Sequence, residues 1–339
     1  MAKTIVAVEI TEESVRAVEV TRGANPRIIA AGEIPLPTDA ARDSEVLDKD
    51  AVALAVRQLW SRSGIRSHRV VLGVGSRRIL VREHSTQAMH PQLLRQALPF
   101  QVQELLPVPV AQAVLDFYPI GQAEGTLHGL LVAAVSETIE DLIDTLARAR
   151  LHVDAVDFVP FGLARAAKLL AAPGETTALV HIGDHTTYVV VTIDGIPQFV
   201  RIIPADIDTA AVQARAQTAA TAEAVLETVP AEPPQLRGRA ALRAASASSA
   251  AIVDLASRVS HTLAFHAERP GASPVDTVRL CGAGVAVPGV VDALASVLEA
   301  RLSPVTAEEV VGARSIELGS ADLALNIVGT TGLAIEGVR

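Results

Sequence analysis

VAVEITEESVRAVEV (residues 6–20) joins two β-rich runs through the polar turn Thr11 to Glu13. Runs of this length separated by a short polar turn predict a β-hairpin. A third β-rich run, residues 27–34, extends the hairpin to three strands. The same unit returns as LVHIGDHTTYVVV (residues 179–191), within the longer stretch 177–203. This internal repetition predicts two lobes of similar α/β topology.

Between the two hairpins, the pattern predicts a smaller α+β unit inserted in the first lobe. It contains strands, a helix that Pro91 opens and Pro99 kinks, and a helix with Ser136 at its N-cap. We expect a variable loop at about residues 229–243, where prolines and Gly238 interrupt an alanine-rich helix. The predicted organisation is a first lobe at 1–75 and 153–173, an inserted subdomain at 76–152 and a second lobe at 174–339.

Composition narrows the class of protein. Half of the 339 residues are hydrophobic, but no run reaches the roughly 18 apolar residues of a transmembrane helix, so we expect no direct membrane insertion. The N-terminal ten residues lack the features of a signal peptide. Cys281 is the only cysteine, which excludes an internal disulfide and fits a reducing compartment. A net charge of −9 with scattered arginines argues against nucleic-acid binding.

Paired hairpins that each open a lobe are the phosphate clamps of actin-like ATPases. Backbone N–H groups and small hydroxyls in a tight turn can cradle phosphate oxygens. A nearby carboxylate can hold Mg²⁺, usually through water, and a later glycine-rich turn lets the backbone approach a nucleoside. The sequence therefore predicts a crevice between the lobes in which the two hairpin turns face each other.

The two hairpins resemble those of the PilM family of type IV pilus assembly proteins. VRLCGAGVAVPGVVDAL (residues 278–294) resembles that family's adenosine motif. LPFQVQELLPVPVAQAVLDFYPIG (residues 98–121) is similar to its inserted subdomain, and Gly332-Leu333-Ala334 fits its ending. The resemblance covers nearly the whole chain. It implies an actin-like, ribonuclease-H-like fold and a cytoplasmic scaffold at the inner membrane, which binds the N-terminal peptide of a PilN-like protein and meets other pilus assembly proteins.

The chain departs from the family pattern at the nucleotide site. Ala7, Glu9 and Thr11 stand where the family has Gly, Asp and Gly, and His181 stands where an Asp is expected. Two interpretations remain open. In one, the hairpins and glycine turn bind ATP with Mg²⁺, and Glu9 and Asp184 hold the metal. In the other, the same residues only build turns and caps. We expect no catalytic residue and no appreciable hydrolysis. The candidate nucleotide-binding residues are Glu9, Thr11, Ser14, Arg16, Gly183, Asp184, Thr186, Thr187, Gly282, Ala283 and Gly284.

The inserted unit carries the hypothesis of a partner site. An apolar turn at a helix end and two aromatic residues on a strand are expected to form a groove for an extended peptide. The alternative is that they seal the core of the inserted unit. The groove residues are Leu105, Leu106, Pro107, Val108, Phe117 and Tyr118. Self-association remains open.

Two other functions compete with this interpretation. A filament-forming protein resembling FtsA would share the inserted subdomain, but it usually ends in an amphipathic membrane-targeting helix that we do not find before Arg339. A small-molecule kinase on the same fold would need a catalytic carboxylate near the cleft, for which the inserted unit offers only Asp116.

Overall fold

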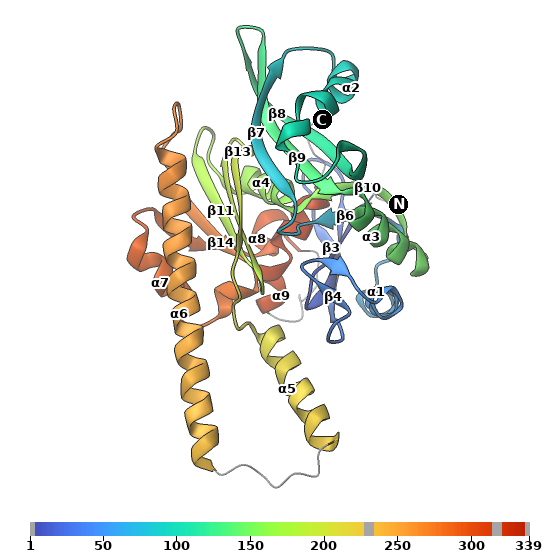
Figure 1. Ribbon diagram of the computed structural model, residues 1–339, viewed down its shortest axis with the longest axis vertical. Helices are drawn as coiled ribbons and strands as arrows, with labels where there is room; N and C mark the ends of the chain where they lie inside the picture. Colours follow the sequence, from blue (N-terminus) through green and yellow to red (C-terminus); the bar gives the residue numbers. More distant parts are fainter. Residues whose placement is uncertain (1–3, 227–233, 314–320, 336–339) are drawn as a thin grey trace.

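The computed structural model describes residues 4–226, 234–313 and 321–335 and has two lobes, each built on a five-stranded sheet (Figure 1). In spatial order the first sheet contains β10 (His152–Phe158), β6 (Arg69–Val74), β1 (Thr4–Ile10), β2 (Ser14–Thr21) and β3 (Ile28–Pro35). The second contains β15 (Arg301–Pro304), β14 (Thr277–Cys281), β11 (Thr176–Ile182), β12 (Thr186–Ile193) and β13 (Ile196–Pro204). Both sheets combine three antiparallel hairpin strands with two parallel ones. The predicted repeat is therefore confirmed.

The first lobe buries both faces of its central strand, which explains why β1 is almost continuously apolar. Helix α1 (Lys49–Ser63) covers the outer face. It begins where the Asp48 side chain accepts hydrogen bonds from two backbone N–H groups, and it ends at Gly64, whose φ of 74° only glycine adopts easily. A short hairpin, β4 (Ala41–Arg42) and β5 (Glu45–Val46), precedes this helix.

The inserted unit is a three-stranded antiparallel sheet with one helix. Its strands, in spatial order, are β7 (Leu80–Gln87), β9 (Thr126–Val135) and β8 (Ala113–Ala123). Helix α2 (Pro91–Gln101) is followed by the 3₁₀ turns η1 (Gln103–Leu105) and η2 (Val110–Gln112). The core of this unit is small, and its fully buried members are Leu98, Val102 and Leu131.

Helix α3 (Ser136–Arg148) belongs to the first lobe by its packing, whereas the sequence placed it in the inserted unit. Its Leu142 and Leu146 pack in the same core as α1. The apolar face of α3 needs a large partner surface, and the inserted sheet offers only a small one. Ser136 is the first helical residue rather than the N-cap, and no side chain caps the helix.

The second lobe carries two helices that project away from its sheet, α5 (Ala210–Leu226) and α6 (Pro234–Ala267) (Figure 1). The C-terminal half of α6 packs against the sheet through Leu255 and Val259. Helix α7 (Val290–Val297) follows the 3₁₀ turn η3 (Ala283–Ala286). The predicted loop at 229–243 is wrong from Pro234 onward, because a proline at the first helical position does not interrupt a helix. Residues 227–233 lie outside the described residues.

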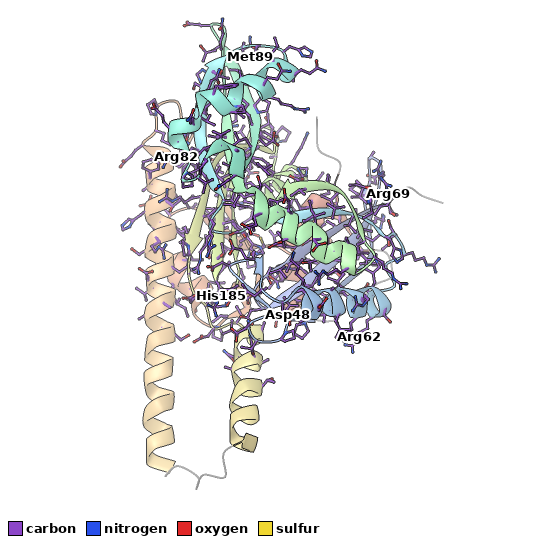
Figure 2. All side chains as sticks on the ribbon, turned by 45° about the vertical axis from the view of Figure 1, so that its right-hand side comes forward. Asp48, Arg62, Arg69, Arg82, Met89 and His185 are labelled. Atoms are coloured by element: carbon purple, nitrogen blue, oxygen red, sulfur yellow. The ribbon has the colours of Figure 1, made fainter. Side chains whose placement is uncertain are left out.

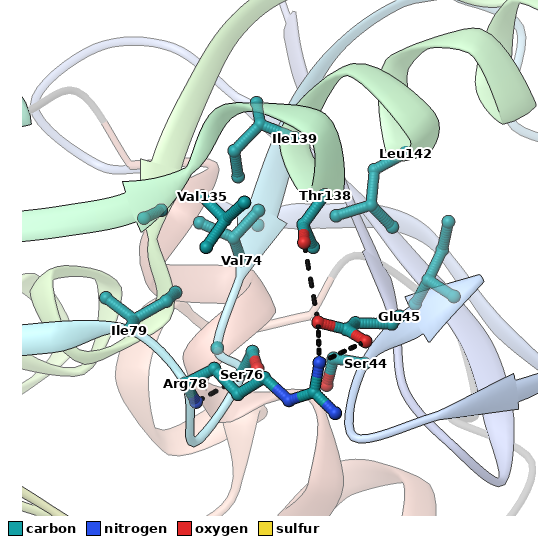
Figure 3. A pocket seen from close by; sticks show the side chains of 14 residues that line it. Ser44, Glu45, Val74, Ser76, Arg78, Ile79, Val135, Thr138, Ile139 and Leu142 are labelled. Carbon is teal, nitrogen blue, oxygen red and sulfur yellow. Dashed lines mark hydrogen bonds and ion pairs between the residues drawn. The ribbon is translucent and has the colours of Figure 1, made fainter. Parts of the chain in front are cut away.

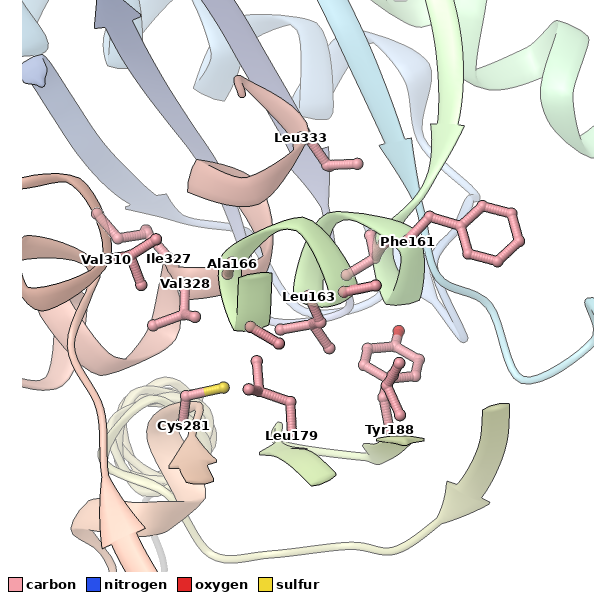
Figure 4. Packing of buried hydrophobic residues seen from close by; sticks show 14 of the residues in the cluster. Phe161, Leu163, Ala166, Leu179, Tyr188, Cys281, Val310, Ile327, Val328 and Leu333 are labelled. Atoms are coloured by element: carbon pink, nitrogen blue, oxygen red, sulfur yellow. The ribbon is translucent and has the colours of Figure 1, made fainter. Parts of the chain in front are cut away.

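A central layer joins the lobes (Figure 4). It contains α4 (Val159–Leu170), α8 (Ala307–Val311), α9 (Ala321–Asn326) and α10 (Val328–Leu333). Helices α4 and α10 meet so closely that a Cβ on Gly332 would lie 1.9 Å from the carbonyl oxygen of Gly162. Only glycine allows this approach. Within the described ranges, no helix is both long and apolar enough to cross a bilayer.

Candidate functional site

The two hairpin turns face each other across a cleft between the lobes. The cleft contains about 390 Å³ of empty space that opens to solvent. Thr11 of the first turn and Gly183 of the second both line it, as the repeat predicted. Six of the candidate nucleotide-binding residues line this cleft: Glu9, Thr11, Arg16, Gly183, Asp184 and Thr186.

A buried ion pair lies at the floor of the cleft. The Arg16 guanidinium is 3.6 Å from the carboxylate of Glu9, and both side chains are more than nine-tenths buried. Arg16 also donates a 3.2 Å hydrogen bond to the carbonyl of Asn326, and the Thr330 hydroxyl donates to Glu9 at 2.9 Å. Burial alone would lower the pKa of Arg16, but the carboxylates of Glu9, Glu33 and Asp184 outweigh it and raise the pKa.

The backbone groups at the two turns already have partners. The Thr11 N–H donates to the Ser14 carbonyl at 2.9 Å, and the Gly183 N–H donates to the Thr186 carbonyl at 3.0 Å. The Asp184 carboxylate accepts the Thr209 hydroxyl. These groups stabilise the turns themselves, and a phosphate would have to compete for them.

A polar clasp, formed by Glu13, His185 and Arg215, joins the two lobes beside the cleft. Glu13 lies in the first hairpin turn, and its Oε1 is 3.0 Å from Nε2 of His185 and 2.8 Å from Nη1 of Arg215, both in the second lobe. Nδ1 of His185 faces Asp206 at 2.8 Å. Figure 2 shows His185 beside the base of α5.

The charge states of the clasp follow from these contacts. Only a protonated imidazole can donate to carboxylates from both nitrogens. The hydrogen bond to Glu13 is the main cause that raises the pKa of His185 to about 9, against the opposing effect of burial. Burial raises the pKa of Glu13, but hydrogen bonds from His185 and Arg215 outweigh it, so the net pKa is lowered. The clasp is therefore charged at neutral pH.

Two aromatic rings form the inner end of the cleft. His181 stacks on Tyr188 with ring centroids 5.7 Å apart, and its Nδ1 lies 3.6 Å from the Cys281 sulfur. Burial, with a smaller contribution from Arg16, lowers the pKa of His181 to about 3, so the ring is neutral. Tyr188 donates its hydroxyl to the carbonyl of Gly75 in the first lobe. His181 thus packs within the second sheet, against Tyr188 and Cys281.

The remaining candidates lie away from the cleft hollow. Ser14 is buried and donates to Glu33, and Thr187 is fully buried. A Cβ on Gly282 would lie 2.2 Å from the carbonyl oxygen of Ile182, so this glycine allows the chain to pass close to β11. Ala283 and Gly284 continue the same turn.

Six further residues line the cleft but are not among the predicted nucleotide-binding residues. These residues are Glu12, Asp43, Ser44, His181, His185 and Tyr188. Glu12 and His185 could have been found, because each belongs to a hairpin turn that the repeat singled out. No local signal marks Asp43 and Ser44, which reach the cleft through the β4–β5 hairpin.

Carboxylates in and around the cleft could hold a cation. Glu9 and Asp184, the predicted metal ligands, line the same hollow from opposite lobes. Among the residues that the structure describes, Glu12, Glu13 and His185 place ligand atoms within 4.8 Å of one another. Glu13 and His185 of this group already bond to one another, and Arg215 contributes a positive charge beside them.

A second hollow, the junction pocket, lies between the first lobe and the inserted unit (Figure 3). It also contains about 390 Å³ of empty space open to solvent. Apolar side chains form most of its wall, among them Ile79, Val135 and Ile139. Glu45 accepts hydrogen bonds from Arg78 at 2.7 and 2.8 Å and from Thr138 at 3.4 Å.

None of the six predicted groove residues lines the junction pocket. Leu105, Leu106 and Phe117 pack against the small core of the inserted unit, which favours the alternative considered from the sequence. Tyr118 packs on Phe161 of α4 with centroids 4.7 Å apart. Pro107 is exposed and Val108 half-buried, so both can reach a partner.

Asp116, the carboxylate that a kinase would need, lies on β8 and lines neither hollow. Asp116 is an exposed residue of this strand. No carboxylate of the inserted unit therefore lines the cleft, and the kinase alternative lacks the catalytic group that it would need.

Two lobes of matching sheet order, a cleft between their opening hairpins and an inserted α+β unit define a protein of the actin-like ATPase fold. Residues 7–202 match the family described as type IV pilus assembly protein PilM. The chain belongs to this family.

Solved structures agree with this fold. A chain from a structure described as a PilM-PilN type IV pilus biogenesis complex is similar over 98% of each chain, with a TM-score of 0.77 and 21% identity. Ethanolamine utilization protein EutJ from Carboxydothermus hydrogenoformans is similar over 98% of this chain and 90% of its own, with a TM-score of 0.54 and 14% identity. A search of curated proteins finds no match.

Proposed function

We propose that this chain is a scaffold of the type IV pilus assembly machinery and that it holds the cytoplasmic N-terminal peptide of a PilN-like membrane protein. In this proposal the chain lies in the cytoplasm, is attached to the inner membrane through that partner, and contacts other pilus assembly proteins. Membership of the PilM family and the similarity to a chain of a PilM-PilN complex support the class of partner.

The observation that carries the proposal is the junction pocket. It is a mostly apolar hollow with a few polar groups, which is the usual composition of a ligand site. Its walls come from two separate units, so an extended peptide can enter between them. At one wall the N-terminus of α3 has no side-chain cap, which leaves N–H groups to receive a peptide carbonyl.

The groove residues predicted from the sequence have a secondary part in this proposal. Leu105, Leu106 and Phe117 keep the inserted unit folded, and Tyr118 holds it against α4. Pro107 and Val108 are candidates for contacts with the partner beyond the pocket.

The nucleotide site is degenerate in this proposal. Four carboxylates line the cleft, those of Glu9, Glu12, Asp43 and Asp184, against the cations Arg16 and His185. A triphosphate would meet net negative charge unless Mg²⁺ came with it. The turn N–H groups that would cradle phosphate are bonded within the hairpins. ATP with Mg²⁺ would therefore bind weakly, and hydrolysis is not part of the function.

Isothermal titration calorimetry tests the proposal with a synthetic cytoplasmic peptide of a PilN-like partner, with and without ATP and Mg²⁺. The peptide should bind, and ATP should give little heat. Thr138→Arg places a long charged side chain in the junction pocket and should reduce affinity at least tenfold, or about 1.4 kcal/mol.

The matched control is Ile143→Arg, which makes the same charge change on an exposed position of the same helix and should bind normally. Absence of peptide binding to the unmodified chain would refute the partner. Equal loss in both variants would refute the pocket as the site.

A further inference from the structure

The cleft and the junction pocket share one wall. Ser44, at the tip of the β4–β5 hairpin, lines both hollows. Its neighbour Asp43 lines the cleft, and Glu45 on the other side lines the junction pocket. Any movement of this tip therefore changes the two hollows together.

The tip is held in an unfavourable backbone conformation. Asp43 has φ of 53° and Ser44 has φ of 62°, in the left-handed region. Consecutive positive φ values suit a tight hairpin turn, which is normally built with Asn, Asp or Gly at the first position and Gly at the second, so Ser44 is the unfavourable residue. A strained conformation persists only where surrounding contacts fix it.

Those contacts come from the link between β6 and β7, residues 75–79. Asp43 forms an ion pair with Arg77, and Glu45 forms one with Arg78. The carbonyl of Gly75 in the same link accepts the Tyr188 hydroxyl from the cleft. The link is thus tied to the tip and to the second lobe.

The tip is also tied to the clasp. The Asp43 N–H donates to the Glu12 carboxylate at 3.1 Å, and Arg215 donates to the Glu12 carbonyl at 3.2 Å. Arg215 and His185 hold the adjacent Glu13. Opening the clasp would release the turn that positions Glu12, and with it one of the contacts that hold the tip.

We propose that the β4–β5 tip and the 75–79 link couple the two hollows, so that closure of the lobes and occupation of the junction pocket influence each other. A ligand in the junction pocket that displaces Glu45 from Arg78 loosens the tip and weakens the clasp. By linkage, breaking the clasp raises affinity at the junction pocket. Only the identity of the junction ligand rests on the proposed function.

Hydrogen–deuterium exchange of the purified chain tests the coupling without any partner. Glu13→Gln removes the negative charge that holds the clasp, and we expect exchange at residues 41–46 and 75–79 to become about threefold faster. Arg78→Ala acts from the other side, and we expect a similar increase at Ala205 and Ile207, whose N–H groups bond to His185 and Asp184.

Matched controls are Asp154→Asn and Arg69→Ala, which break an exposed ion pair with an N–O distance of 2.7 Å at the far end of β6. They should leave exchange in both hollows unchanged. The coupling is refuted if Glu13→Gln and Arg78→Ala each speed exchange only around their own positions, or if the controls act equally.

A peptide titration separates this inference from the proposed function. If the PilN-like peptide binds, Glu13→Gln should tighten its binding about threefold, and weaker binding would contradict the coupling. Unchanged affinity would refute the coupling, while the partner assignment would stand. If the peptide does not bind the unmodified chain, the proposed function is refuted, and the exchange experiment alone decides the coupling.

Discussion

The interlobe cleft and the junction pocket each contain a glutamate–arginine pair, but the two pairs differ in burial. Glu9 and Arg16 are almost fully buried, whereas Glu45 and Arg78 are 24% and 60% exposed. The buried pair depends on its partners because water does not solvate it. The charges of the exposed pair can separate at little cost, because water solvates each of them. The polar floor of the cleft is therefore fixed, whereas the ion pair of the junction pocket can give way to a ligand.

The largest effect should come from Arg16→Met. Removal of the guanidinium leaves the buried carboxylate of Glu9 without its cation, and we expect a loss of about 3 to 5 kcal/mol in the free energy of unfolding. Urea denaturation measures it. The double variant Glu9→Gln with Arg16→Met should recover part of the loss. A loss below about 1 kcal/mol would mean that water reaches the pair and that the comparison is wrong.

The next effect is a pH dependence of the clasp. The pKa of His185 is about 9 in the folded chain, against an ordinary value of 6.5. The folded state binds the extra proton between these values, so the stabilisation is complete below pH 6.5 and is lost as pH rises through 9. At about 1.4 kcal/mol per pKa unit, the loss is up to about 3.5 kcal/mol.

Urea denaturation at several pH values measures this slope, and His185→Gln should remove it. A slope that persists in the variant would assign it to another group. At the acid end, the lowered pKa of Glu13 predicts a separate loss as pH falls below 4.5.

A smaller effect distinguishes two neighbouring threonines on α10. Thr330 donates to Glu9 at 2.9 Å, so Thr330→Val should cost about 1 to 2 kcal/mol in unfolding free energy. The hydroxyl of Thr331 is equally buried and has no hydrogen-bond partner in the described structure. Thr331→Val should therefore be neutral or stabilising. Equal costs in thermal unfolding would show that the hydroxyl of Thr330 does not support Glu9.

The smallest effect should come from Arg78→Ala in the junction pocket. Loss of an exposed ion pair should lower the free energy of unfolding by less than about 1 kcal/mol. Urea denaturation measures this loss. The difference in unfolding free energy between Arg78→Ala and the unmodified chain should be smaller in 1 M salt than in 0.1 M salt, because salt screens exposed charges. A loss as large as that of Arg16→Met would show that the two ion pairs contribute equally to stability, and the contrast between the two hollows would be wrong.

The sequence by itself determined the repeated hairpins, the order of the helices and the inserted sheet. Each has a local signal, such as the polar turn at Thr11 to Glu13 or the stop at Gly64. It also determined that Glu9, Arg16 and Asp184 would approach one another, because the repeat places both turns at one cleft. Two predictions from local rules were wrong. Ser136 was predicted to cap a helix of the inserted unit, but it is the first residue of α3, which packs on the first lobe. Pro234 was predicted to lie in a loop, but it occupies the first position of α6, where a helix tolerates proline.

Only the tertiary structure decided what the two hollows contain. The clasp joins Glu13 to His185 and Arg215, which are far apart in the chain, and no spacing rule connects them. The junction pocket depends on how the inserted unit leans on α3, and the shared wall depends on the strained tip at Asp43 and Ser44. Local sequence sets backbone preferences and periodicity, but contacts between distant segments follow from how whole faces bury their apolar surface.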